Sequence, residues 1–268
     1  MSTAIEFVNI KKSYGNKTVV EDFSLAVEKG EFVTIIGSSG SGKTTILKMV
    51  NGLILPDAGK VLVEGRDILS GDLIALRRNI GYAIQGSVLF PHMTVEKNIA
   101  YVPGLLNKNN KKKTEDAVLK WMNIVGLDED MLSRYPDELS GGQQQRVGIA
   151  RSLAASPDIL LMDEPFGAVD EITRAQLQDE ISAIHQKTGI TILFVTHDIS
   201  EALKLGTRVL VMDNGLIQQY ASPRDILAEP ATDFVRRLAA KERRTCSLPE
   251  ERLRDCEYSS AFSLPHGS

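Results

Sequence analysis

Apolar and polar residues alternate in short runs over the first part of the chain. The pattern holds in AIEFVNI, FSLAVEKG and EFVTIIG, which lie between residues 4 and 37. Alternation with a period of two is typical of strands that bury one face, so three strands are predicted here. The turns between them are predicted at Gly15-Asn16 and Lys29-Gly30.

Beyond Gly42 the apolar positions recur with helical spacing up to Leu53, and Pro56 predicts the end of this helix. A strand is predicted over NIGYAIQ, and residues from about 87 to 155 are predicted to be mostly helical. Strands return in DILLMDEP and GITILFVTHD, which are rich in branched residues. Because strands and helices alternate along the chain, we expect a parallel sheet covered by helices.

The lysine-rich run NKNNKKK, residues 107–113, lies between two of the predicted helices. Such charge runs are usually solvated, so it is predicted as a loop rather than as an anion or lipid site. Further on, RVLVMDNGLIQQY predicts a hairpin, and SPRDILAEP predicts a helix capped by Ser222 with Pro223 in its first position. Residues 241–268 are charged and serine-rich without a clear period, which predicts a poorly ordered tail.

The composition disfavours several classes of protein. A net charge of -4 over 268 residues gives no support for a nucleic-acid binder, so no nucleic-acid partner is expected. The two cysteines, Cys246 and Cys256, lie in the predicted tail and suggest a reducing compartment rather than a disulfide framework. No apolar run reaches the roughly 18 residues of a membrane span, and the N-terminus lacks signal-peptide features. We therefore expect a cytoplasmic chain that makes no pore alone.

The motif GSSGSGKT, residues 37–44, lies between a predicted strand and a predicted helix, as a phosphate loop requires. Glycines let the backbone turn tightly so that amides face phosphate oxygens, and Lys43 adds a positive charge to the same oxygens. The Thr44 hydroxyl can ligate Mg²⁺. The residues assigned to ATP binding in this segment are Gly37, Ser38, Ser39, Gly40, Ser41, Gly42, Lys43, Thr44 and Thr45.

LLMDE supplies two carboxylates at the end of an apolar strand. Asp163 is predicted to emerge at the sheet edge near the metal, as a ligand of Mg²⁺ together with Thr44. Glu164 follows it and is predicted to face the attacking water, where alignment and modest proton acceptance are required. A surface acidic pair at a strand end is the alternative, and the phosphate loop elsewhere in the chain makes the catalytic interpretation the better one.

A second anion-binding helix end is predicted at LSGGQ, where Ser140-Gly141-Gly142 opens a helix with outward-pointing amides. Phosphate loop, LSGGQ, LLMDE and a histidine after a strand occur in this order over residues of about 3 to 240. Through these motifs and their order the chain resembles the ATP-binding cassette family, and LSGGQ is the motif that is specific to that family. The resemblance implies an α/β phosphate-loop NTPase (RecA-like) core, an antiparallel β subdomain and an inserted helical subdomain at about residues 87–155.

The resemblance also assigns roles beyond the phosphate loop. Two cassette subunits would pack head to tail, as a homodimer or a paired cassette, so that the LSGGQ of one caps the ATP of the other. His197 matches the histidine that holds the γ-phosphate and orients Glu164. The remaining matches are Tyr14 for stacking on adenine, Gln85 for Mg²⁺ and γ-phosphate sensing, Asp170 for the dimer interface, and Ser140, Gly142 and Gln143 for the partner's ATP.

Three segments resemble the branch of bacterial importers that takes up glycine betaine, carnitine, choline and similar quaternary amines: LFPHMTVEKNIA, DEPFGAVDEITR and QQYASPRDILAEPATDFV. Membrane permease subunits, a solute-binding protein and a position on the inner face of the cell membrane are implied. Members of this branch often continue into paired regulatory domains, for which the residues after 240 are too few.

Other interpretations stay open at this stage. The nearest alternative is an importer of another solute, such as a polyamine, an amino acid or sulfate. A non-transport cassette of DNA repair or translation, or a phosphate-loop kinase, is a different class. Repair proteins of this type insert a very long coiled coil between the phosphate loop and LSGGQ. Here only 97 residues separate Lys43 from Ser140, which leaves no room for one. A kinase would have a substrate-binding lid and no LSGGQ.

Overall fold

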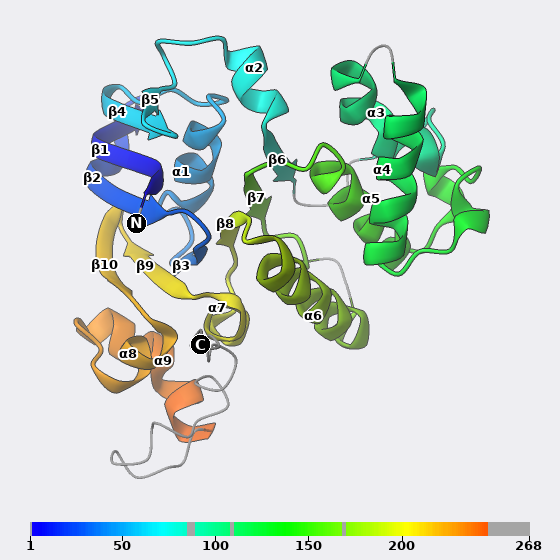
Figure 1. The fold of residues 1–268 in the computed structure, drawn as a ribbon. Helices are drawn as coiled ribbons and strands as arrows, with labels where there is room; N and C mark the ends of the chain where they lie inside the picture. Colours follow the sequence, from blue (N-terminus) through cyan, green and yellow to red (C-terminus); the bar gives the residue numbers. More distant parts are fainter. Residues whose placement is uncertain (1, 85–88, 108–109, 168–169, 246–268) are drawn as a thin grey trace, which may run out of the picture.

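Two sheets form the framework of the protein (Figure 1). The computed structural model describes residues 2–84, 89–107, 110–167 and 170–245, with side chains as far as Glu242. The smaller sheet has the strand order β2-β1-β4-β5, with antiparallel pairing throughout. Its strands are β1 (Thr3–Tyr14), β2 (Lys17–Glu28), β4 (Ala58–Val63) and β5 (Arg66–Asp67).

The larger sheet has the order β10-β9-β3-β8-β7-β6. All of its pairings are parallel except the terminal β9–β10 hairpin. Its strands are β3 (Phe32–Gly37), β6 (Ile80–Ala83), β7 (Ile159–Asp163), β8 (Thr191–Val195), β9 (Arg208–Asp213) and β10 (Leu216–Ala221). The parallel sheet predicted from the alternation of strands and helices is thereby confirmed.

Helices cover both faces and one end of the larger sheet (Figure 1). A group of three, α3, α4 and α5, lies beyond the edge strand β6, in the region predicted to be mostly helical. The antiparallel sheet and α1 lie on the opposite side of the molecule. The helices are α1 (Lys43–Val50), α2 (Leu73–Arg78), α3 (Val95–Leu106), α4 (Lys111–Ile124), α5 (Gly141–Leu153), α6 (Glu171–Thr188), α7 (Ile199–Leu205), α8 (Pro223–Ala228) and α9 (Asp233–Thr245).

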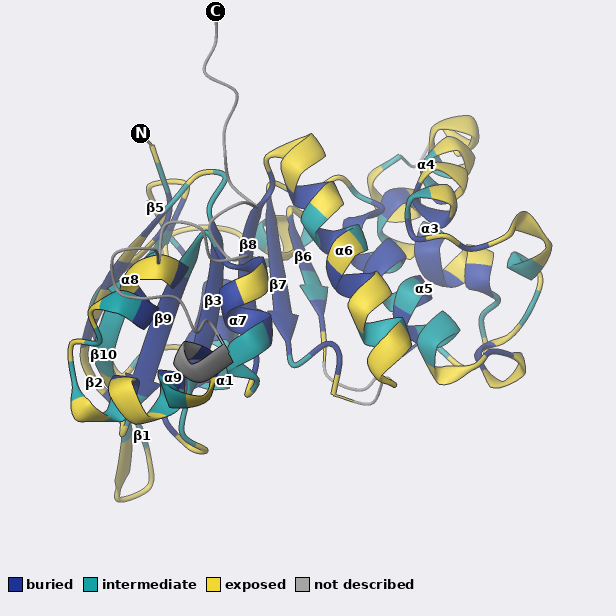
Figure 2. Ribbon diagram, turned by 90° about the horizontal axis from the view of Figure 1, so that it is seen from below, coloured by how far each residue is buried: buried dark blue, intermediate teal, exposed yellow. Residues whose placement is uncertain are grey.

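The central strands are buried on both faces, which explains their nearly continuous apolar sequences (Figure 2). On β8, Ile192 and Phe194 pack in the core shared with the helices α3 to α6. Their neighbours Leu193 and Val195 pack in the core beneath α1 and the antiparallel sheet. Successive side chains of a strand point to opposite faces, so one short strand joins the two cores.

Two local predictions are confirmed in detail. The β9–β10 hairpin turns at Asn214 and Gly215, which both have positive φ (49° and 78°), as a primed two-residue turn requires. Helix α8 begins at Pro223, and the Ser222 hydroxyl accepts a hydrogen bond from the Asp225 amide at 3.2 Å. Both are cases in which a few adjacent residues determine the backbone.

Two other local predictions are wrong in their extent. The lysine run does not stay a loop, because α4 begins at Lys111 and Asn110 caps it by accepting from the Lys113 amide at 3.0 Å. Helix α9 continues to Thr245, five residues into the segment predicted as a tail from residue 241. The Glu242 side chain is buried there, and the Ser200 hydroxyl of α7 donates to it at 2.8 Å. Residues 246–268 lie outside the described residues.

Phe194→Ala is expected to lower the free energy of unfolding by about 3–5 kcal/mol, because a fully buried ring is replaced by a cavity. The ring lies 5.4 Å from Phe166 and 6.0 Å from Phe32, between centroids. Urea unfolding followed by circular dichroism measures the change. Ile74→Ala, at a side chain that is 59% exposed, is the control and should change stability by less than about 0.5 kcal/mol. Equal effects of the two changes would contradict the assignment of the core.

Candidate functional site

The phosphate loop connects β3 to α1 and turns within tight backbone surroundings. Gly37 has φ 155°, and a Cβ added there would lie 1.8 Å from the carbonyl oxygen of Met212. Gly42 has φ 96°, and a Cβ there would lie 2.8 Å from a methyl group of Val20. Larger residues at these two positions would push the loop away from β9 and β2. The loop therefore has the curled backbone that the motif predicts.

The Lys43 side chain lies against the phosphate loop. Its Nζ donates to the carbonyl oxygens of Gly37 at 3.0 Å and Ser38 at 2.8 Å, and the residue is 8% exposed. Burial lowers the pKa of Lys43, while the carboxylates of Glu164 and Asp163 act in the opposite direction. The buried hydroxyl of Ser41 has no hydrogen-bond partner among the described residues. A cation and an unsatisfied hydroxyl thus lie together at this loop, a combination that suits a bound anion.

The predicted Mg²⁺ ligands Thr44 and Asp163 are in contact. The Thr44 hydroxyl donates to Asp163 Oδ1 at 2.9 Å. Asp163 ends β7 and is 5% exposed, and this burial raises the pKa of its carboxyl group, although the Thr44 hydrogen bond lowers it. A hydroxyl beside a carboxylate is an oxygen pair of the kind that Mg²⁺ prefers. Within the described residues no group of three His, Cys, Asp or Glu side chains could hold a metal ion, so these two oxygens would need phosphate or water as further ligands.

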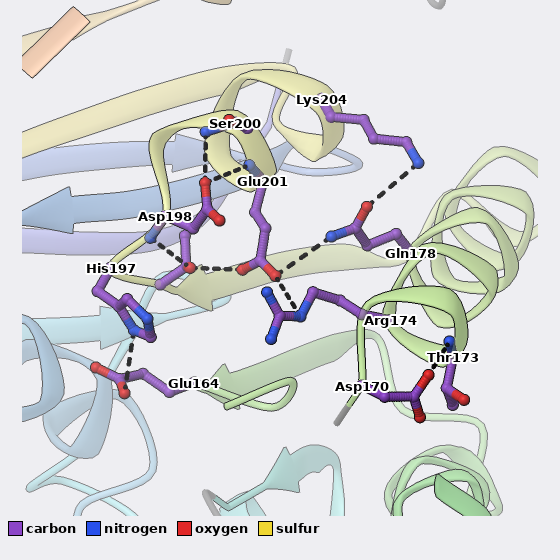
Figure 3. Close-up of polar contacts among 11 residues, drawn as sticks. Glu164, Asp170, Thr173, Arg174, Gln178, His197, Asp198, Ser200, Glu201 and Lys204 are labelled. Carbon is purple, nitrogen blue, oxygen red and sulfur yellow. Dashed lines mark hydrogen bonds and ion pairs between the residues drawn. The ribbon is translucent and has the colours of Figure 1, made fainter. Parts of the chain in front are cut away.

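Glu164 and His197 face each other from neighbouring strand ends (Figure 3). Asp163 pairs with Val195 in the parallel register of β7 and β8, so the next residues of both strands emerge together. His197 Nδ1 lies 3.5 Å from Glu164 Oε2; the glutamate side chain is 27% exposed and the histidine 70%. Glu164 has a positive φ of 44°, a conformation that costs roughly 1 kcal/mol or more in a non-glycine residue. The backbone is thus held in an unfavourable conformation at the glutamate predicted to act in catalysis.

The LSGGQ segment begins α5 in a capping box. The Ser140 hydroxyl accepts from the Gln143 amide at 3.3 Å, and the Gln143 side chain accepts from the Ser140 amide at 2.9 Å. A Cβ on Gly142 would lie 2.8 Å from a methyl group of Thr173 on α6. Asp170 caps α6 by accepting from the Thr173 amide at 3.0 Å. These helix starts lie close together, and Figure 1 shows α5 and α6 on the far side of β7 from α1.

Two further residues were predicted to contact the nucleotide or Mg²⁺, Tyr14 and Gln85, and the structure describes only the first. Tyr14 ends β1, is 49% exposed, and has Lys12 Nζ 5.6 Å from its ring centroid. Lys17, across the hairpin from Tyr14, comes within 3.9 Å of a Cβ placed on Gly40, so this turn lies beside the phosphate loop. Gln85 lies outside the described residues. The structure therefore brings the phosphate loop together with Asp163, Glu164 and His197, and Tyr14 lies near this group. The other predicted residues lie apart from it, at the starts of α5 and α6: Ser140, Gly142, Gln143 and Asp170.

Two residues of the site are not among the predicted ones. Asp213 ends β9 and accepts from the Ser38 hydroxyl at 2.6 Å. The Tyr82 hydroxyl on β6 is buried without a partner among the described residues, and burial together with Asp163 raises the pKa of Tyr82 to about 12. Asp213 is at a strand end like Asp163, but only the pairing of β9 with β3 brings it to the loop.

A parallel sheet with the phosphate loop after β3 and two adjacent carboxylates at the end of β7 defines the class of phosphate-loop nucleotide-binding proteins. The ABC transporter family model matches residues 20–167. The chain belongs to this family. The fold class predicted from the sequence is confirmed by structural similarity: a dimeric post-hydrolysis structure of the ATP-binding cassette MJ0796, bound to ADP and Pi, has a TM-score of 0.74 at 31% identity. This comparison covers 82% of this chain and 98% of that one.

Curated relatives are similar over most of this chain. The carnitine transport ATP-binding protein OpuCA of Listeria monocytogenes is 48% identical over 247 residues, which are 92% of this chain and 62% of that protein. The glycine betaine uptake system ATP-binding protein YehX of Escherichia coli K12 is 48% identical over 232 residues, 87% of this chain and 75% of that protein. The chain thus spans less than two thirds of the length of some relatives. In the described part of the chain, no helix has the length and apolar character needed to cross a bilayer.

Proposed function

We propose that this chain is the ATP-hydrolysing subunit of an importer for an osmoprotectant such as glycine betaine or another quaternary amine. The proposal of ATP hydrolysis rests on the Glu164–His197 pair, whose Oε2 and Nδ1 atoms are 3.5 Å apart. This pair lies at the same edge of the sheet as the Thr44–Asp163 pair. The family of the chain and its similarity to a cassette bound to ADP and Pi support the nucleotide. The solute rests on the three segments that resemble the quaternary-amine branch and on the names of the relatives.

In this proposal the phosphate loop binds the β- and γ-phosphates through its amides and the Ser41 hydroxyl. Lys43 exchanges the carbonyl oxygens of Gly37 and Ser38 for phosphate oxygens, which are stronger partners for an ammonium group. Tyr14 stacks on the adenine from the neighbouring hairpin. Gly37, Ser38, Ser39, Gly40, Gly42 and Thr45 complete the contacts of the loop.

Thr44 and Asp163 are the side chains that would hold Mg²⁺, with Gln85 as a further proposed ligand. When bound, Mg²⁺ neutralises charge on the phosphate oxygens. Glu164 orients the attacking water and accepts a proton from it, and its half-buried carboxylate is close enough to the loop to influence Lys43. His197 keeps the Glu164 carboxylate in place and faces the γ-phosphate with its other nitrogen.

Two chains complete each site in this proposal. Ser140, Gly142 and Gln143 belong to the capped start of α5, which packs on α6, on the far side of β7 from the phosphate loop of its own chain. A second copy packed head to tail would bring this helix end over that loop, with Asp170 at the contact. Dimeric structures of a similar cassette support the pairing of two chains. Membrane permease subunits on the inner face of the cell membrane and a solute-binding protein are the further partners proposed.

Uptake of labelled glycine betaine at high osmolarity tests the solute. Cells that carry the wild-type chain with its native membrane partners should take up the label, and cells with Lys43→Ala should not, because transport requires hydrolysis. Lys60→Ala, an exposed position on β4, is the matched control and should transport normally. Equal uptake with Lys43→Ala, in cells without another betaine system, would reject this solute and leave the ATPase proposal standing.

A further inference from the structure

A buried carboxylate behind His197 has no role in the site as described so far. Glu201, on α7, is 7% exposed. Its Oε2 accepts from the Thr196 hydroxyl at 2.6 Å, and its Oε1 accepts from Gln178 Nε2 at 3.3 Å. Arg174 Nε lies 3.8 Å from the same Oε1 (Figure 3). Burying a carboxylate is costly unless donors or cations surround it, and here a hydroxyl from the loop after β8 and an amide and a guanidinium from α6 do so.

The first of these contacts fixes the backbone on both sides of His197. The Thr196 hydroxyl donates to Glu201 and also accepts from the Asp198 amide at 3.0 Å. Asp198 Oδ1 in turn accepts from the amides of Ser200 at 2.8 Å and Glu201 at 3.4 Å. Hydrogen bonds therefore connect the residues before and after His197 to the start of α7, and the Thr196 hydroxyl takes part in two of them.

The imidazole itself has little else to hold it. The His197 side chain is 70% exposed, and its described polar contact is the 3.5 Å approach to Glu164. A side chain this exposed depends on its backbone for its position. The distance between the two residues proposed for hydrolysis is thus determined by the loop that Thr196 and Asp198 hold.

The other two contacts connect this loop to α6. Gln178 and Arg174 both lie in the first two turns of α6, the helix that Asp170 caps. Gln178 is 7% exposed, and Lys204 of α7 donates to its Oε1 at 3.2 Å, so the amide that reaches Glu201 is itself fixed. Figure 3 shows Arg174 and Gln178 reaching from α6 toward the Glu201 carboxylate, with His197 and Glu164 on its other side.

We propose that Glu201 is a positioning residue for ATP hydrolysis, which sets the place of His197 relative to Glu164 by holding Thr196 on one side and α6 on the other. The inference rests on the proposed function and adds a residue to it. Glu201 is buried on α7 and belongs neither to the phosphate loop nor to the Thr44–Asp163 pair. Removing it should therefore displace the imidazole without removing any group that binds ATP.

Steady-state ATP hydrolysis by purified full-length variants tests the proposal. Glu201→Ala should lower kcat by about 10- to 100-fold, because a displacement of about 1 Å in a catalytic group can cost this much. KM for ATP should stay within about threefold of the wild-type value, since the phosphate loop is untouched. Glu201→Gln still accepts from Thr196, so it should recover most of the lost kcat.

Two more variants separate positioning from folding. Thr196→Val keeps the shape of the side chain, removes the hydroxyl alone, and should lower kcat in the same way even where Glu201→Ala folds poorly. Ser200→Ala removes a hydrogen bond from the same helix toward Glu242 of α9, and it should leave kcat unchanged. Thermal melting is recorded for each variant.

Normal kcat in folded Glu201→Ala and Thr196→Val would overturn the inference. A rise in KM that parallels the fall in kcat, with a lowered melting temperature, would also overturn it, because a merely structural residue behaves in this way. An inactive wild-type protein would instead refute the proposed function, so the two failures are distinguishable.

Discussion

Lys43→Ala is expected to lower ATP hydrolysis at least about 100-fold, since it removes a preorganised charge from the phosphates in a partly buried site. The ammonium group is enclosed by the loop, and its present acceptors are the Gly37 and Ser38 carbonyls. An alanine leaves the curl of the loop intact because the glycines determine that curl. A phosphate-release assay measures the rate.

Lys60→Ala is again the matched control, since it removes the same charge from an exposed position on β4. It should hydrolyse ATP at the wild-type rate. If Lys43→Ala retained more than a few per cent of that rate, the assignment of residues 37–44 as the phosphate loop would be refuted. A large loss in both variants would point to the net charge of the protein instead.

Glu164→Gln is expected to hydrolyse ATP about 10²–10⁴-fold more slowly and to accumulate as an ATP-bound dimer. Glutamine has nearly the shape of glutamate, and the backbone bond from the residue 164 amide to the Val195 carbonyl, 2.9 Å long, does not depend on the side chain. Binding groups are therefore kept while proton acceptance is lost. Size-exclusion chromatography with light scattering, with and without ATP and Mg²⁺, detects the dimer.

Adding Ser140→Arg to Glu164→Gln provides the control for the dimer. The arginine side chain would crowd the helix end that is proposed to meet the partner's phosphates, so the double variant should stay monomeric with ATP. If Glu164→Gln alone remained monomeric in ATP and Mg²⁺, the shared site would fail or would need the membrane partner. A dimer that survives Ser140→Arg would place the contact elsewhere.

The parts of the fold that could be predicted from the sequence depend on residues close together in the chain. Asn214-Gly215 forces its turn, Ser222 caps α8 within four residues, and the apolar run before Asp163 is a strand because both of its faces are buried. The strands β4 and β5 and helix α2 lack a comparable signal; α2 has no buried residue at all. The start of α4 within a lysine run was missed because Asn110, one short cap, outweighs the unfavourable charges.

In the candidate site, too, the residues that could be predicted are those marked by their neighbours in the sequence. Asp163 ends β7, Glu164 follows it, His197 comes two residues after β8, and Lys43 and Thr44 begin α1 after the loop that follows β3. Parallel strands bring such residues to one edge. Asp213 and Tyr82 could not be predicted, because their places depend on which strands are neighbours. The Glu201 network joins α6 to α7 across 23 to 27 positions of sequence, and no local pattern marks such contacts.

The separation of the LSGGQ helix end from the phosphate loop of its own chain has a consequence for genetics. In a mixed dimer, a copy altered at Lys43 and a copy altered at Ser140 would place both defects in the same site and leave the other site whole. Each altered copy alone would build two defective sites. Two recessive alleles of this one gene could therefore complement each other, and the phenotype of a cell would depend on how its alleles are paired rather than on the number of sound copies.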